Sequence, residues 1–227
     1  MPDPTLRAHY DAIFAQGAQA LRTGEAAGDK LLLHPAQDTR LGLTVLLPLP
    51  HLAAALQAVQ AEIQATEPAL YQYPPTDLHV TVISLLTARP NRRFSPAQWQ
   101  AYAAVVAAAA TETAAFTILF EGLTLSAQAV VAQGYPTPAL QQLRETIRAL
   151  AVAQGLPLDE RYHSQTAHAT FVRFPQLPRH PQALVQFVEA HRDLPLGTET
   201  VTEILLVAHD WYNRQARSQV LARFQLK

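Results

Sequence analysis

The sequence predicts an α+β fold built from two similar halves. Apolar segments of strand length alternate with segments of helical periodicity, and the order strand, helix, strand occurs twice along the 227 residues. The second strand of each half carries one His and one Thr inside an apolar run. This order of elements is typical of mixed or antiparallel sheets rather than of a doubly wound parallel sheet.

The first half contains a helix, a strand, a second helix and a second strand. Residues 5–22 have apolar side chains at helical spacing and are followed by Gly24, which predicts an amphipathic helix. The apolar run 40–47 is bounded by prolines and predicts a buried strand, and 51–65 returns to a helical period. Residues 78–85 are rich in β-branched side chains and predict the next strand.

A helix and a meander are predicted in the middle of the chain. Ser95, with Pro96 and Gln98 after it, has the pattern of a helix start, and this helix is expected to end near residue 110. Three short strands follow, at 115–120, 123–126 and 129–133.

The second half repeats the pattern. A helix opens at Thr137 and ends near Gly155, a strand is predicted at 167–174, and a short helix at 181–190. Two closing strands complete the prediction, at 201–209 and 218–226.

Composition and charge exclude several function classes. The chain has 17 Lys and Arg against 18 Asp and Glu, so it lacks the broad positive field that binds long duplex nucleic acid. It has no Cys, which excludes disulfides, thiolate metal sites and a cysteine nucleophile. The N-terminus has no signal-peptide pattern and no segment has the length and hydropathy of a membrane span, so we expect a cytoplasmic protein that does not bind membranes.

Each half carries a His-x-Thr motif, His79 with Thr81 and His168 with Thr170. Side chains two residues apart on a strand share one face, so each motif presents an imidazole beside a hydroxyl. If both pairs face one cleft, one imidazole can accept a proton and the other can donate one, while the hydroxyls bind phosphoryl oxygens. The pattern favours cleavage of a phosphodiester without a metal ion.

Chance leaves a simpler interpretation open. The 9 His and the Thr residues of the chain would give roughly 0.75 such matches at random, so two matches are weak on their own. Their matching places in the apparent repeat strengthen the functional interpretation, because polar groups inside apolar strands need partners. The alternative is that both are satisfied core or surface histidines.

The segments LHVTV and AHATFVRF resemble the 2H phosphoesterase superfamily, which includes 2′-5′ RNA ligase-like proteins and cyclic phosphodiesterases. The segments RLGLTVLLP, VTEILLVAHDWYN and SQVLARFQL extend this resemblance over about residues 40–226. It implies a two-lobed fold with pseudo-twofold symmetry around a central cleft. It also implies that His79 and His168 are catalytic and that Thr81 and Thr170 bind phosphate.

The resemblance adds Arg173 to the candidate site residues, and the sequence departs from the family pattern in two places. Arg173 stands five residues after the second His, where many members have an Arg that contacts phosphate or the transition state. The first motif reads HVTVISLLT and lacks the Phe-Leu-Gly ending that is frequent in the ligase-like branch. We assign 1–38 as an N-terminal helical extension and 39–227 as a single bilobal domain.

Other polar residues carry weaker hypotheses. The pair His209-Asp210 has the composition of a metal-binding motif but closes an apolar strand, so we interpret it as a strand-end polar pair, and we expect no metal site and no cofactor. Tyr135, Trp211 and Tyr212 could stack on a base or could be half-buried aromatic residues.

The sequence therefore predicts a monomeric, metal-independent phosphoesterase. Its expected substrate is a cyclic phosphate or a 2′-5′ phosphodiester of a nucleotide or RNA end, with the two histidines as general base and general acid. The alternatives are a reversible 2′-5′ RNA ligase and a module that binds a nucleotide or RNA end without turnover.

Overall fold

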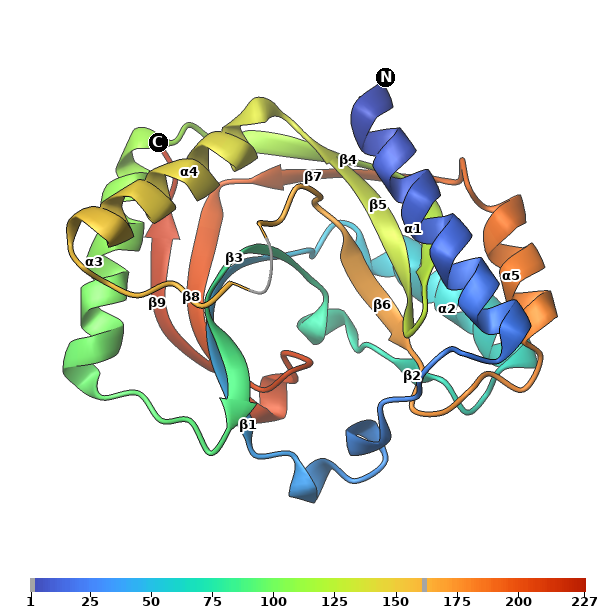
Figure 1. Ribbon diagram of the computed structural model, residues 1–227. Helices are drawn as coiled ribbons and strands as arrows, with labels where there is room; N and C mark the ends of the chain where they lie inside the picture. Colours follow the sequence, from blue (N-terminus) through green and yellow to red (C-terminus); the bar gives the residue numbers. More distant parts are fainter. Residues whose placement is uncertain (1–2, 161–162) are drawn as a thin grey trace.

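The computed structural model describes residues 3–160 and 163–227, whose strands form two antiparallel sheets (Figure 1). The order in the four-stranded sheet is β3 (His79–Pro90), β1 (Arg40–Pro48), β8 (Glu203–His209) and β9 (Gln219–Gln225). The order in the five-stranded sheet is β2 (Tyr71–Gln72), β6 (Ala169–Arg173), β5 (Ala129–Pro136), β4 (Phe116–Ser126) and β7 (Pro195–Val201).

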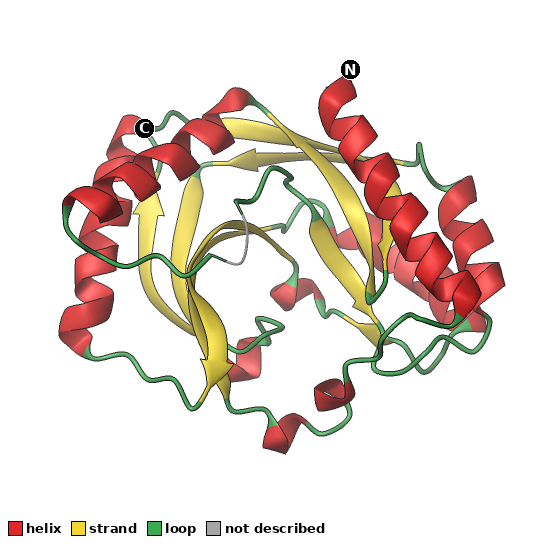
Figure 2. Ribbon diagram, viewed as in Figure 1, coloured by secondary structure: helices red, strands yellow, loops and turns green. Residues whose placement is uncertain are grey.

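Five α-helices in the described residues surround these sheets (Figure 2). Those packed against the four-stranded sheet are α3 (Pro96–Glu112) and α4 (Pro138–Ala153). Those packed against the five-stranded sheet are α1 (Pro4–Thr23), α2 (Ala53–Thr66) and α5 (Pro181–Ala190). Short 3-10 turns lie at η1 (Lys30–Leu32), η2 (Pro35–Gln37), η3 (Pro75–Asp77) and η4 (Gln215–Arg217). The two-lobed α+β class predicted from the sequence is confirmed.

Helix ends follow the side chains that the sequence offers. The Ser95 hydroxyl accepts a hydrogen bond from the Gln98 N–H at 3.2 Å, as its capping pattern predicts. Asp3 caps α1 by accepting from the Thr5 N–H at 2.7 Å. The same helix ends at Gly24, whose φ of 73° lies in the left-handed region that glycine adopts without strain.

The two lobes do not correspond to consecutive halves of the sequence. The four-stranded sheet takes β1 and β3 from the first half and β8 and β9 from the second. The five-stranded sheet takes β2 from the first half and the remaining strands from residues 116–201. Each sheet therefore pairs strands that are far apart in the chain. The order of elements along the sequence does not predict these pairings.

Two predicted boundaries are wrong for identifiable reasons. The strands predicted at 115–120 and 123–126 form the single strand β4, which continues through an irregularity at Gly122. A Cβ at Gly122 would collide with the carbonyl oxygen of Arg192, so this glycine permits close packing rather than ending a strand. The segment predicted as one strand at 201–209 divides near Thr202, because β7 and β8 belong to different sheets.

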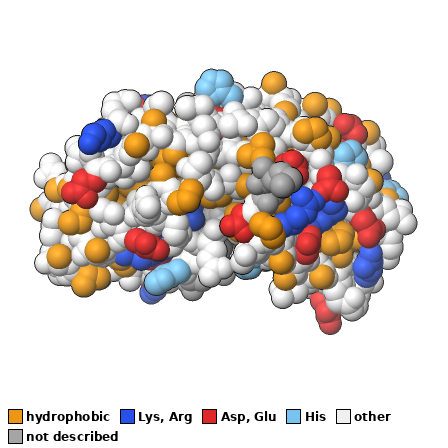
Figure 3. Space-filling model, turned by 90° about the horizontal axis from the view of Figure 1, so that it is seen from above, with side chains coloured by type: hydrophobic (Ala, Val, Ile, Leu, Met, Phe, Trp, Pro, Cys, Tyr) orange, Lys and Arg blue, Asp and Glu red, His pale blue; other side chains and the backbone are white. Residues whose placement is uncertain are grey.

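The surface seen from above carries mixed charge (Figure 3). Lys and Arg side chains lie there among Asp and Glu side chains, with no broad area of one sign on this face. In residues 3–160 and 163–227, no helix is long and apolar enough to cross a membrane.

Candidate active site

The first His-x-Thr motif begins strand β3. His79 is the first residue of the strand and lies opposite Pro48 of β1, and Thr81 lies opposite Leu46. Both motif side chains are half-buried, whereas Val80 between them is buried in the core. His79 and Thr81 therefore share one face of the strand, as the two-residue period predicts.

Irregular pairing then changes which residues of β3 face that side. A register shift between Val45 and Leu46 of β1 adds one residue to β3 after Thr81. Such a bulge reverses the alternation, so Ser84 lies on the same side of the strand as the motif. A second register shift, between Leu43 and Thr44 of β1, adds another residue to β3 after Ser84. Thr87 therefore also lies on the side of the motif.

The second motif lies at the start of β6. His168 directly precedes this strand, rather than lying in its middle as the sequence predicts, and Thr170 is its second residue. A register shift between Val130 and Val131 of β5 adds one residue to β6 after Thr170. The bulge brings Arg173, which strict alternation would place on the opposite face, to the side of His168.

The two motifs thus share one local geometry. Each consists of His-x-Thr, a bulge, and a polar side chain five residues after the His, which is Ser84 in the first motif and Arg173 in the second. The repeat is chemically unequal, because the first motif ends in a hydroxyl and the second in a guanidinium.

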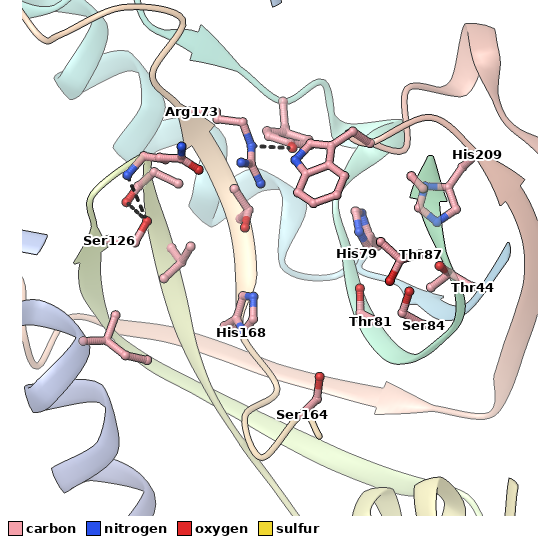
Figure 4. Close-up of a pocket in the computed structure, with 18 of the residues that line it drawn as sticks. Thr44, His79, Thr81, Ser84, Thr87, Ser126, Ser164, His168, Arg173 and His209 are labelled. Carbon is pink, nitrogen blue, oxygen red and sulfur yellow. Dashed lines mark hydrogen bonds between the residues drawn. The ribbon is translucent and has the colours of Figure 1, made fainter. Parts of the chain in front are cut away.

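Both motifs line a single cavity of about 380 Å³ between the two sheets. Figure 4 shows the imidazoles of His79 and His168 on different strands, with the cavity between them. The five residues that the sequence and its resemblance single out all belong to the wall: His79, Thr81, His168, Thr170 and Arg173. The structure therefore brings both histidines, both hydroxyls and one guanidinium to the same space.

Helix α1 forms part of the same wall through Tyr10 and Ile13. The Tyr10 hydroxyl donates to the carbonyl oxygen of Gly134 at 3.0 Å and accepts from the Gly134 N–H at 3.1 Å, which attaches α1 to β5. Gly17 lets the helix backbone approach Leu125 so closely that a Cβ would collide with its carbonyl. The segment assigned as an extension thus contributes side chains to the cavity.

The hydrogen bond of His79 defines its protonation pattern. Nδ1 lies 2.7 Å from the carbonyl oxygen of Asp77, which is much closer than the side-chain amide nitrogen of Asn213 at 3.3 Å. A carbonyl oxygen only accepts, so Nδ1 carries the proton and Nε2 of the neutral ring keeps a lone pair. In this tautomer Nε2 can accept a proton from an attacking hydroxyl or water.

His168 has a different partner. Its Nδ1 lies 2.7 Å from the hydroxyl oxygen of Thr166, which can either donate or accept. When the hydroxyl donates, Nδ1 is the acceptor and Nε2 carries the proton. His168 can therefore present a hydrogen-bond donor to the cavity as a neutral ring, and a transferable proton once the ring is protonated.

Both imidazoles are held in the neutral form before a ligand binds. Burial lowers the pKa of His79, and the nearby Arg173 guanidinium lowers it further, against the opposing effect of Asp77. Burial lowers the pKa of His168 to about 4, and the nearby His79, Arg144 and Arg173 lower it further. A bound phosphate anion would raise both pKa values, because it favours the protonated form.

A buried arginine connects the two motifs from behind. Arg144 of α4 is 1% exposed, and its Nε donates to the carbonyl oxygen of Val82 at 2.7 Å. Its Nη2 donates to the carbonyl oxygens of Thr81 at 3.0 Å and Thr166 at 2.8 Å. One guanidinium therefore holds the first motif and the residue that contacts His168, and it fixes the distance between them.

Two aromatic residues proposed from the sequence lie outside the cavity wall. Tyr135 is buried and its hydroxyl donates to Gln133 at 2.6 Å. Tyr212 is fully buried, so no base can stack on its ring. Trp211, which the sequence analysis also named, does line the cavity, together with Tyr73.

The cavity wall also contains an acidic residue, Glu160, that the sequence analysis did not single out, and the pair His209-Asp210 lies nearby in β8 and the residue after it. Glu160 lines the cavity and accepts from Arg148 at 2.7 and 2.9 Å, so its charge is neutralised. Asp210 accepts from the Arg214 Nε at 2.6 Å. His209, interpreted as part of a strand-end pair, lines the cavity. Within the described parts of the chain, no three His, Asp or Glu side chains are grouped to hold a metal ion.

The lowered pKa values predict weaker folding in acid. The pKa of His168 and that of His209 are each lowered to about 4, with burial as the largest cause, whereas an unfolded His titrates near 6.5. Between these values the unfolded chain binds protons that the folded chain does not, so stability is full above about pH 6.5 and decreases toward about pH 4.

We expect the free energy of unfolding to fall by about 1–3 kcal/mol per histidine across this window. Urea unfolding near pH 7 and near pH 5 measures the change. His209→Phe should reduce the difference, and equal wild-type stability at both pH values would contradict the assignment.

Comparison with solved structures identifies the fold. TT0787 of Thermus thermophilus matches with a TM-score of 0.60 and 21% sequence identity, over 82% of this chain and 97% of that chain. Escherichia coli LigT in its apo form matches with a TM-score of 0.55 and 17% identity, over 84% of this chain and 98% of that chain. A structure described as a phosphoesterase matches with a TM-score of 0.55 and 19% identity, over 84% of this chain and 99% of that chain.

These matches show a LigT-like fold, which confirms the fold that the sequence resemblance implies. The sequence matches no protein-family model and no curated protein.

Proposed function

We propose that this chain is a phosphoesterase that cleaves a cyclic phosphate or a 2′-5′ phosphodiester of a nucleotide or RNA end without a metal ion. The observation that carries the proposal is the convergence of both His-x-Thr motifs and Arg173 on one cavity. Its volume of about 380 Å³ lies in the range of small-molecule sites. LigT structures contain 3′-AMP and phosphate, which are ligands of the same chemical class.

The two histidines take different roles in this proposal. His79 is the general base, because its Nδ1–H is committed to a carbonyl oxygen and Nε2 is the acceptor. His168 is the general acid in its protonated form, which the bound phosphate anion favours; its Nδ1–H then donates to the Thr166 hydroxyl and its Nε2–H is the proton to be transferred. Water attacks phosphorus as His79 removes its proton, and the leaving ribose oxygen takes a proton from His168.

The other polar residues of the motifs bind the phosphoryl group. The hydroxyls of Thr81 and Thr170 donate hydrogen bonds to its oxygens, and Arg173 neutralises the negative charge that grows in the transition state. Arg173 is oriented by its Nε, which donates to the Tyr73 hydroxyl at 3.2 Å. The alternative reaction, ligation, would use a ribose hydroxyl in place of water to attack a cyclic phosphate, with the same two histidines.

A substrate panel with a chelator tests the proposal. We expect turnover of a 2′,3′-cyclic nucleotide or a 2′-5′ dinucleotide, with a 3′-5′ dinucleotide as the control linkage, and we expect EDTA to leave the rate unchanged because the mechanism needs no Lewis acid. Chromatographic analysis of the products measures the turnover of each substrate with and without EDTA. Strict dependence on an added divalent ion would overturn the mechanism, and nucleotide binding without turnover would favour the binding-module alternative.

A further inference from the structure

The cavity contains a third imidazole that the proposed reaction does not use. His209 is the last residue of β8, lies opposite Gly42 of β1, and is 9% exposed. Its ring lines the same cavity as the two motif histidines. In Figure 4 it lies beyond His79 as seen from His168.

The ring of His209 presents an acceptor without a partner. Nδ1 lies 2.5 Å from the carbonyl oxygen of Asp210, so Nδ1 carries the proton and Nε2 has the lone pair. Nε2 is buried and has no hydrogen-bond partner among the described residues. A buried acceptor without a partner is unfavourable, and such an atom at a cavity wall indicates a position for a ligand donor.

The acceptor persists at neutral pH. Burial and the neighbouring His79 lower the pKa of His209 to about 4, against the smaller opposing effect of Asp210. The ring is therefore uncharged near pH 7, and Nε2 remains able to accept. A protonated His209 would instead bind an anion, so this neutrality distinguishes it from a second phosphate contact.

Hydroxyl groups surround this part of the cavity. Thr44 of β1 and Ser84 of β3 are paired across the two strands, and both line the cavity. Figure 4 shows both residues near His209. We call His209, Thr44 and Ser84 the His209 subsite. Its members are uncharged polar groups, which suit a neutral polar ligand such as a sugar or base rather than a second phosphate.

We propose that the His209 subsite binds the nucleoside attached to the reacting phosphate, with His209 Nε2 accepting a hydrogen bond from an N–H or O–H group of that nucleoside. The inference rests on the proposed function, because His79 and His168 place the phosphate beside this subsite. The donor is either the ribose 2′-hydroxyl or an amino group of the base, which share the chemistry that the subsite recognises.

Binding measurements with matched ligands test this. The probes are inorganic phosphate, adenosine 3′-monophosphate, its 2′-deoxy analogue, and the 3′-monophosphate of purine riboside, which lacks the base amino group. Wild-type protein should bind one of the two donor-deficient nucleotides about 5- to 10-fold more weakly than adenosine 3′-monophosphate, the loss expected for one neutral hydrogen bond. Calorimetric titration gives the dissociation constants and shows which donor is used.

The His209→Phe variant completes the test, with His34→Phe as a control at an exposed histidine outside the cavity. We expect His209→Phe to bind adenosine 3′-monophosphate and the critical donor-deficient nucleotide equally, and to bind inorganic phosphate as wild type does. His34→Phe should retain the wild-type preference.

Two results would overturn the inference. Equal wild-type affinity for all three nucleotides shows that no donor is read, and this measurement needs no variant to fold. Equal weakening of phosphate and nucleotide binding in His209→Phe assigns the residue to the fold or to the phosphate site. Failure of the proposed function is a separate outcome, in which wild-type protein turns over none of the substrate panel.

Discussion

Replacement of His79 or His168 by Ala is expected to lower kcat by about 10²- to 10⁴-fold while the protein stays folded. Each substitution removes an imidazole ring, which is the proton-transfer group. Both rings are half-buried in the cavity wall and neither belongs to the apolar core. Steady-state kinetics with the best substrate of the panel measures the loss, and thermal unfolding confirms the fold. His34→Ala, at an exposed site, is the matched control.

A change of leaving group distinguishes the two histidines. A nitrophenyl phosphodiester releases a stable anion that needs no proton, so it should restore much of the activity of His168→Ala and little of that of His79→Ala. The reason is the tautomer of His79, whose Nδ1–H is committed to the Asp77 carbonyl. Equal rescue of both variants would contradict the assigned roles, and wild-type activity in either variant would support the alternative of satisfied structural histidines.

Arg144→Met is expected to destabilise the protein by about 3 kcal/mol or more, because it leaves three carbonyl oxygens in a buried region without their donor. Below its unfolding temperature the variant should also have a lower kcat, since the link between the Thr81 and Thr166 backbones is lost. Denaturant unfolding and kinetics at the same temperature measure the two effects. Arg223→Met, at an exposed ion pair, serves as the control.

A spectroscopic measurement separates positioning from general stability. The charge of Arg144 is one cause of the lowered pKa of His168, so its removal should move that pKa toward the ordinary value. NMR titration of the imidazole protons reports this directly. An unchanged His168 titration together with wild-type kcat would show that Arg144 serves stability alone.

Sequence periodicity predicts part of the site, because the placement of residues two positions apart on a strand depends only on local backbone geometry. His79 and Thr81 share a face by the two-residue period of a strand, and the same spacing relates His168 to Thr170. The bulges after each motif are properties of strand pairing, so no local pattern predicts that Ser84 lies in the cavity. Arg173 was predicted from family resemblance, and the bulge supplies the physical reason for its orientation.

Residues that reach the site through tertiary packing escaped prediction. Arg144 lies on the apolar face of α4 with Leu140 and Ile147, and only the packed structure shows that it lies behind both motifs. Tyr10 belongs to a segment assigned as an extension, and His209 to a pair interpreted as a strand end. The strand β7 is mostly polar and has no apolar run, so the sequence pattern does not predict it as a strand.

The pairing of β1 with β8 has a consequence for how the protein is synthesised. Leu46 pairs with Leu205, so the partner of the first long strand leaves the ribosome about 160 residues later. Contacts of such long sequence separation form slowly, and a nascent chain that ends before residue 203 exposes an unpaired edge of β1. Synthesis of residues 203–225, rather than of either histidine motif, is therefore the step that allows the four-stranded wall of the cavity to form.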